Sequence, residues 1–199
     1  MTLPFWPFIY MAKNKEEKVV MKILQDSLKK SNDCVKFVTE VLKCVEGAIV
    51  LAAKVSTYPD SKLPNDLKLE LGLYLREAGP RWDSIFLIAL SQEYFNLYYR
   101  GKPMATSEFD INEEHILPLI QKYTHLNSVI NTEDLTLVHN MKPQLDGKQI
   151  CELYGIKPGK AIKHVMEEEI KYQILHPSAD YDQVSQFLAE KQEDYLKKY

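Results

Sequence analysis

Residues 145–162 read LDGKQICELYGIKPGKAI, and this stretch decides the fold that we expect around it: a short helix, a tight turn and a second helix. Asp146 is expected to cap the first helix, with Gln149 as its capping-box partner three residues later. Gly155 is expected to end this helix in the left-handed conformation. Pro158 is expected to begin the second helix, because its φ angle is already helical and it has no N–H to leave unpaired.

The turn between these helices has two interpretations. The free N–H groups from Gly159 to Ala161 are expected to point toward the turn, beside Lys157 and Lys160, and a helix N-terminus with a close-approach glycine is suited to binding a phosphate. This favours recognition of a nucleic-acid backbone. The same spacing also fits an ordinary hairpin of two helices with solvated lysines. The residues alone leave both interpretations open.

The rest of the chain repeats the helical pattern. Apolar residues recur at helical spacing almost throughout, and the 199 residues include only seven glycines. We therefore expect an all-α fold, an irregular helical bundle of about five helices followed by a smaller helical hairpin tail. The expected domains are a body, 1–135, and a tail, 136–199. Besides the hairpin, the expected helices are 14–30, 34–57, 65–77, 81–99, 112–131 and 181–197.

Apolar faces predict which helices are buried. The segment 81–99 is the most hydrophobic and is expected to be central. Leu28, Leu97 and Ile120 are among the residues expected on buried faces. In the helix that follows Pro158, the acidic residues 167–169 are expected on the solvated side, together with lysines.

Composition narrows the function classes. The chain is 45% hydrophobic and has a net charge of −3, so a nucleic-acid site would have to be a local basic patch. Three widely spaced cysteines indicate neither a disulfide framework nor a zinc site. Asp180 and Asp182 have a spacing used in two-metal sites, but Gln183 makes a helix cap at Asp180 the better interpretation. The apolar residues 1–11 are too short to span a membrane.

Three segments, in this order along the chain, resemble one family. They are DSLKKSN at 26–32, LGLYLREAGPRW at 71–82, and MKPQLDGK at 141–148 followed by GIKPG at 155–159. Together they resemble the body and tail of eukaryotic, fungal-type class II CCA-adding enzymes, which are tRNA nucleotidyltransferases. Lys160 departs from the family pattern, in which another proline often follows the glycine.

The resemblance implies a tRNA-holding role. In the family, a catalytic head binds Mg²⁺, CTP and ATP and a neck selects the base, and the motifs of both are missing from these 199 residues. No catalytic residue, metal ligand or cofactor site is therefore carried over, and we expect the chain to be inactive alone. The implied partners are the acceptor stem and elbow of tRNA and the head–neck portion, with no membrane, in the mitochondrion, cytoplasm or nucleus. The implied phosphate-binding residues are Gly155, Lys157, Gly159 and Lys160, with Lys148, Arg76 and Arg81 as weaker candidates.

A different class of function fits the acidic net charge and the apolar first residues. The chain could be a helical protein-interaction or assembly module without RNA contact. A stand-alone enzyme would need a site for which the sequence offers no motif.

Overall fold

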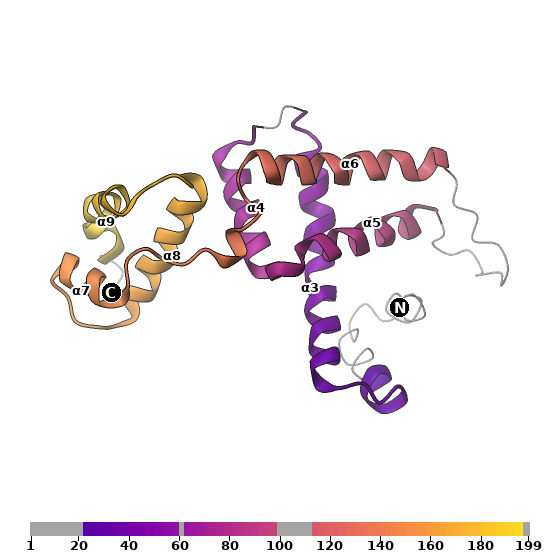
Figure 1. Ribbon diagram of the computed structural model, residues 1–199, viewed down its shortest axis with the longest axis horizontal. Helices are drawn as coiled ribbons and strands as arrows, with labels where there is room; N and C mark the ends of the chain where they lie inside the picture. Colours follow the sequence, from indigo (N-terminus) through magenta and orange to yellow (C-terminus); the bar gives the residue numbers. More distant parts are fainter. Residues whose placement is uncertain (1–21, 60–61, 99–112, 197–199) are drawn as a thin grey trace.

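The computed structural model describes residues 22–59, 62–98 and 113–196, and within these ranges all regular structure is helical (Figure 1). The all-α prediction is confirmed. Residues 1–11, most of the helix expected from Asn14 and the segment 107–109 lie outside the described residues. The elements are a π-helical turn η2 (Ile23–Ser27), α3 (Asn32–Val55), α4 (Asn65–Ala78), a 3₁₀ turn η3 (Gly79–Arg81), α5 (Trp82–Tyr98), α6 (Glu113–Thr132), a 3₁₀ turn η4 (Val138–Asn140), α7 (Gly147–Tyr154), α8 (Lys160–Leu175) and α9 (Tyr181–Leu196).

Helix α3 runs through the middle of the bundle, with α4 on one side of it and α5 extending to the other, while α6 passes across α3 (Figure 1). It begins where the Ser31 Oγ accepts a hydrogen bond from the Cys34 N–H, a typical N-cap. Helix α5, from the segment expected to be central, buries Ile85, Phe86 and Ala89 in the bundle but leaves Leu87 and Leu97 69% and 60% exposed. Leu28 and Ile120, also expected to be buried, are exposed as well.

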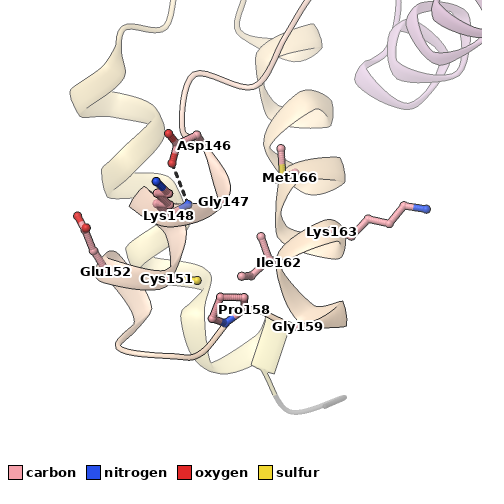
Figure 2. Close-up of a pocket in the computed structure, with 10 residues that line it drawn as sticks. All are labelled: Asp146, Gly147, Lys148, Cys151, Glu152, Pro158, Gly159, Ile162, Lys163 and Met166. Carbon is pink, nitrogen blue, oxygen red and sulfur yellow. Dashed lines mark hydrogen bonds between the residues drawn. The ribbon is translucent and has the colours of Figure 1, made fainter.

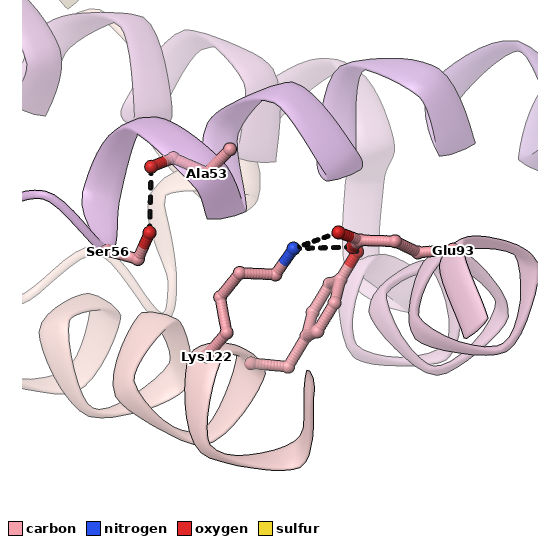
Figure 3. A network of polar contacts seen from close by, with 5 residues as sticks. Ala53, Ser56, Glu93 and Lys122 are labelled. Atoms are coloured by element: carbon pink, nitrogen blue, oxygen red, sulfur yellow. Dashed lines mark hydrogen bonds and ion pairs between the residues drawn. The ribbon is translucent and has the colours of Figure 1, made fainter. Parts of the chain in front are cut away.

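A half-buried polar cluster joins α5 to α6 (Figure 3). Lys122 Nζ donates to both carboxylate oxygens of Glu93, and the Tyr123 hydroxyl donates to Glu93 Oε2 over 3.1 Å. Burial, then the negative charge of Glu93 and its acceptance of the hydroxyl hydrogen bond, raise the pKa of Tyr123. The phenol therefore stays a donor at physiological pH, and the cluster fixes the two helices against each other.

A second buried ion pair holds α4 to the segment that follows α6. Lys68 Nζ lies 2.7 Å from Glu133 Oε2, and both side chains are 11% exposed. Glu133 Oε1 also accepts from the Leu63 N–H over 2.9 Å. Burial raises the pKa of Glu133, but the hydrogen bonds from Lys68 and Leu63 outweigh it and leave the pKa below its ordinary value.

The two larger groups of buried apolar residues form most of the interior, and α8 contributes to both; a third, small group is Leu24 with Val35. Ile170 and Ile174 of α8 pack into the bundle cluster, whereas Ile162 and Val165 belong to the tail cluster. The predicted division into domains 1–135 and 136–199 stays a prediction. The bundle cluster is Val41, Val45, Ala48, Leu51, Ala52, Val55, Leu63, Leu67, Leu71, Leu75, Ile85, Phe86, Ala89, Tyr123, Leu126, Val129, Ile130, Leu135, Val138, Ile170 and Ile174. The tail cluster is Leu145, Ile150, Tyr154, Ile162, Val165, Val184 and Leu188.

Helices α4 and α8 meet at a glycine. A Cβ placed on Gly72 would lie 2.5 Å from Ile174 Cγ2, a distance that side chains do not tolerate. Ile174 is 1% exposed. The tail is therefore attached to the bundle by a close approach of the two helices that requires a glycine on α4.

Among the described residues, no helix has the combination of length and apolar character that a membrane span needs.

Candidate nucleic-acid interface

Helix α7 begins with the predicted capping box. Asp146 Oδ1 accepts from the N–H groups of Lys148 and Gln149 over 2.8 and 2.9 Å, and the Asp146 N–H donates to Gln149 Oε1 over 2.8 Å. Gly155 ends the helix with φ 64° and ψ 30°, the left-handed conformation expected of it. Both helix signals are confirmed.

The start of α8 differs from the prediction. The helix begins at Lys160, and Gly159 is its N-cap residue, with an extended backbone and no capping side chain. Pro158 lies in the bend before it, so the prediction that Pro158 opens the helix is wrong by two residues. The physical reason is that an N-cap residue takes an extended conformation, which interrupts the helix at Gly159. The N–H groups left without a side-chain cap are those that follow Gly159.

Three lysines lie on this hairpin: Lys157 and Lys160 are next to the uncapped helix start in sequence, and Lys148 lies in the first turn of α7. Lys148, Lys157 and Lys160 are all exposed. Within the part of the chain that the structure describes, none of the three lies within ion-pair distance of a carboxylate. Lys163, one turn further along α8, has a loose contact of 3.8 Å with Glu167. The hairpin therefore presents three cations whose charge is not neutralised within the described residues.

An open hollow of about 830 Å³ separates α7 from α8 (Figure 2). Apolar side chains line it on both sides, and Lys148 and Gly159 lie at its edge. Figure 2 shows the Lys163 side chain extending away from the hollow. The apolar lining is formed by Cys151, Pro158, Ile162 and Met166.

Helix α9 holds the end of α7 through two hydrogen bonds to Tyr154. The Tyr154 hydroxyl donates to the Leu188 carbonyl over 2.8 Å, and Gln192 Nε2 donates to the Tyr154 carbonyl over 3.0 Å. Burial, with a smaller contribution from Tyr195, raises the pKa of Tyr154 to about 12, so the phenol keeps its proton and remains a donor. The last carbonyl of α7 is thereby satisfied directly before Gly155, which fixes the start of the turn.

The two predicted arginines lie on the bundle, away from the hairpin turn. Arg76 Nη1 donates to the Val138 carbonyl over 3.5 Å and to the Met141 carbonyl, so it ties α4 to the segment that leads to α7. The Arg81 guanidinium carbon lies 4.2 Å from the centre of the Phe37 ring. The other predicted phosphate-binding residues, Gly155, Lys157, Gly159, Lys160 and Lys148, all lie on the α7–α8 hairpin, and their contact with phosphate stays a prediction.

Sequence reasoning missed Glu169. It was expected on the solvated side of α8, and that expectation is wrong, because its exposed fraction is 0%. A signal for this was present in the sequence: position 169 is four residues after Val165 and seven after Ile162, which places it on the apolar stripe. The negative charge concealed that spacing.

Within the described residues, no three His, Cys, Asp or Glu side chains lie close enough together to hold a metal ion. Asp180 forms the predicted cap: its Oδ1 accepts from the Gln183 N–H over 2.9 Å, and its own N–H donates to Gln183 Oε1 over 3.1 Å.

The chain is similar in sequence to several curated fungal proteins. It is 26% identical over 157 residues to the mitochondrial CCA tRNA nucleotidyltransferase of Candida glabrata, covering 78% of this chain and 27% of that protein. Against tRNA nucleotidyltransferase cca2 of Schizosaccharomyces pombe the identity is 29% over 118 residues, or 59% of this chain and 22% of that protein. Against the mitochondrial CCA tRNA nucleotidyltransferase of Saccharomyces cerevisiae it is 24% over 165 residues, or 83% of this chain and 27% of that protein.

The chain thus spans about a quarter of the length of these curated relatives. No family model matches the chain, and no solved structure matches it. The matches nevertheless agree with one another across three fungal species, and they cover from 59% to 96% of this chain. The chain is a relative of the fungal CCA tRNA nucleotidyltransferases.

Proposed function

We propose that this chain is a tRNA-binding body and tail part of a CCA-adding enzyme, which adds or repairs the 3′-terminal CCA of tRNA. In this proposal, nucleotidyl transfer from CTP and ATP, with Mg²⁺, belongs to a catalytic head that these residues do not supply. The relatives carry the word tRNA in their names, which supports the substrate class. The proposed contacts are with the phosphate backbone at the acceptor stem and elbow.

One observation carries this proposal: Lys148, Lys157 and Lys160 are exposed on the α7–α8 hairpin without carboxylate partners among the described residues, and the start of α8 has no side-chain cap. Backbone N–H groups at a helix N-terminus bind phosphate oxygens, and lysines add point charges to them. Contacts of this type position an RNA without reading its sequence, as an enzyme acting on every tRNA requires. Because the chain carries a net charge of −3, binding depends on this local patch.

The test is the affinity of the chain for an unmodified tRNA transcript, measured by fluorescence anisotropy at several salt concentrations. If three or four phosphates are neutralised, the logarithm of the association constant should fall with the logarithm of salt concentration with a slope of roughly −3. Lys160→Ala should weaken binding about fivefold, or roughly 1 kcal/mol, and flatten the slope by about one unit, without a change in melting temperature.

Lys36→Ala is the matched control, because Lys36 is an exposed lysine on α3 that pairs with Glu40 at 3.9 Å. It removes the same charge from the chain at a position outside the hairpin, so it should leave the affinity close to that of the unmodified chain. The proposal fails if tRNA does not bind at low salt, or if Lys36→Ala and Lys160→Ala weaken binding equally.

A second candidate function is a helical protein-interaction or assembly module without RNA contact. The observation that favours it is the exposure of Leu87 and Leu97 on α5 and of Leu117 on α6, at 69%, 60% and 51%. Sedimentation over a range of concentrations tests for self-assembly, and pull-down with a catalytic head–neck portion tests for that partner. Assembly without tRNA affinity would favour this function over the first.

A further inference from the structure

A carboxyl group is enclosed where the tail joins the bundle. Glu169 lies in the middle of α8 and its exposed fraction is 0%. Its Oε1 accepts from the Gln144 N–H over 2.5 Å and from the Leu145 N–H over 2.9 Å. These two residues immediately precede the Asp146 cap of α7, so the carboxyl group fastens the approach to α7 onto α8.

The other carboxyl oxygen has no hydrogen-bond partner among the residues that the structure describes. Glu169 Oε2 is buried and accepts no hydrogen bond from them, and the same is true of Oε1 of Gln173. The two side chains are four residues apart on one helix, the spacing at which neighbouring turns place side chains beside each other. Two adjacent buried acceptors without a donor are unfavourable, because each has lost its water without replacement. A single proton on the carboxyl group would supply the donor that both oxygens lack.

We propose that Glu169 is a neutral carboxylic acid in the folded protein, that its Oε2–H donates to Gln173 Oε1, and that it forms a pH-sensitive joint between residues 144–145 and α8. The joint rests on contacts within this chain and is independent of any RNA binding. Burial raises the pKa of Glu169, and the hydrogen bonds from Leu145 and Gln144 oppose this without cancelling it. Oε1 accepts hydrogen bonds from the two backbone N–H groups in either protonation state. The proton therefore changes only the hydrogen bonding of Oε2, which can donate when it is protonated.

The elements packed against α8 supply no counter-ion. They are α4, α7 and α9. Among the charged residues of α4, Arg76 donates to backbone carbonyls and Lys68 pairs with Glu133, while the others are exposed. The charged residues of α7 and α9, which are Lys148, Glu152, Asp182, Glu190, Lys191, Glu193 and Asp194, are exposed. On α8 itself, Lys171 pairs with Glu168 over 2.6 Å.

The segment that Glu169 holds also contacts other parts of the chain, so a weaker joint would affect them. Gln144 Nε2 also donates to the Ala179 carbonyl over 2.9 Å, so the same residue contacts the segment before α9. On the other side, the Met141 carbonyl is held by Arg76. Loss of the proton would leave a buried carboxylate with no cation beside it, which is strongly unfavourable. We therefore expect the tail to open from the bundle more readily as pH rises.

The competing arrangement is an ionised Glu169 with the Gln173 amide turned over, so that its NH₂ group donates to Oε2. The two arrangements differ in proton linkage. If the folded pKa is raised above the unfolded value of about 4.3, stabilisation is complete below that pH and is lost as pH rises through the folded pKa. An ionised Glu169 gives no such loss above pH 5.

Glu169→Gln separates these arrangements, because an amide can accept from both backbone N–H groups and donate to Gln173 Oε1 as the neutral acid does. Urea unfolding of the full chain would be measured between pH 5 and 8, with Glu167→Gln, 59% exposed at its side chain, as the control. The unfolding constant of the unmodified chain should rise about tenfold per pH unit relative to Glu169→Gln until the folded pKa is passed. Glu167→Gln should keep the slope of the unmodified chain.

Equal slopes for the unmodified chain and Glu169→Gln would overturn the proposal. If Glu169→Gln does not fold, carbon-13 NMR of the unmodified chain labelled at glutamate carboxyl carbons gives the answer. One carboxyl carbon should keep the chemical shift of a neutral acid at pH 6, where ordinary glutamates are ionised, and this signal should move in Gln173→Leu. Titration of every glutamate between about pH 4 and 5 would refute the neutral acid.

Discussion

The attachment of the tail to the bundle is open to a direct test at Gly72. In Gly72→Ala, the new Cβ would lie 2.5 Å from Cγ2 of the buried Ile174 side chain. Helix propensity alone would stabilise the variant by about 1 kcal/mol, because alanine is the better helix former. Overpacking a filled interior costs about 1–3 kcal/mol, and three carbons of Ile174 within 3.5 Å place this site in the upper part of that range. We expect a net loss of about 1–2 kcal/mol, which lowers the melting temperature by roughly 2–8 °C in a chain of this size.

A double-mutant cycle isolates the contact. Ile174→Ala alone should cost about 2–5 kcal/mol, because it removes a buried side chain and leaves a cavity. In that background the Gly72 Cβ enters vacated space, so Gly72→Ala should become stabilising and the effects of the two substitutions should not add. Thermal and urea unfolding of the four proteins measure this. Gly147→Ala is the control, because its Cβ would lie 3.4 Å from Ile162 Cγ2, an ordinary contact. A higher melting temperature for Gly72→Ala in the unmodified chain would refute the close approach of α4 and α8.

Three further substitutions test the local structure. Asp146→Ala removes the capping box and should lower the free energy of unfolding by about 0.5–2 kcal/mol, measured by urea unfolding; no loss would show that the cap is dispensable. Gly155→Ala should cost about 1–2 kcal/mol from the left-handed backbone alone, since nothing lies within 4 Å of the new Cβ, and Gly155→Asn should cost less. The lowered pKa of Glu133 contributes stability that is present above pH about 4.3 and is lost as pH falls through the folded pKa. In Glu133→Gln, the free energy of unfolding should therefore decrease less steeply as the pH falls below about 4.3. An unchanged pH dependence in that range would contradict this.

The helix ends show what can be predicted from neighbouring residues. Asp146 with Gln149, Gly155, and Asp180 with Gln183 were all predicted from spacing, because each cap depends on groups within four residues of one another. The start of α8 was misplaced because proline and glycine are adjacent there. Pro158 fits the first turn of a helix and Gly159 fits the cap before it, and the backbone settles the choice in favour of the glycine.

Tertiary contacts explain what the sequence could not reveal. Arg76 was a candidate for phosphate, and the structure gives it two carbonyls from a segment more than sixty residues away in sequence. Glu169 was expected to face solvent because it is charged, whereas its partners are backbone N–H groups that no side-chain pattern records. Leu97 was expected to be buried because α5 is apolar on every side, so periodicity could not say which side meets the bundle. The assignment of phosphate contacts to the hairpin lysines stays a prediction.

One end of helix α8 is packed in the tail cluster and the other in the bundle cluster, so the helix fixes both the distance and the rotation between them. Between Lys160 and Ile174 the axial rise is about 21 Å, at about 1.5 Å per residue. Inserting a single residue would lengthen that span only slightly but would turn the lysine-bearing end by about 100° relative to the bundle. A surface touching both ends would then face the wrong direction. The number of residues in α8 thus fixes the direction in which the Lys160 end faces relative to the bundle. An insertion or deletion in α8 should therefore be tolerated far less than one in the loop before it.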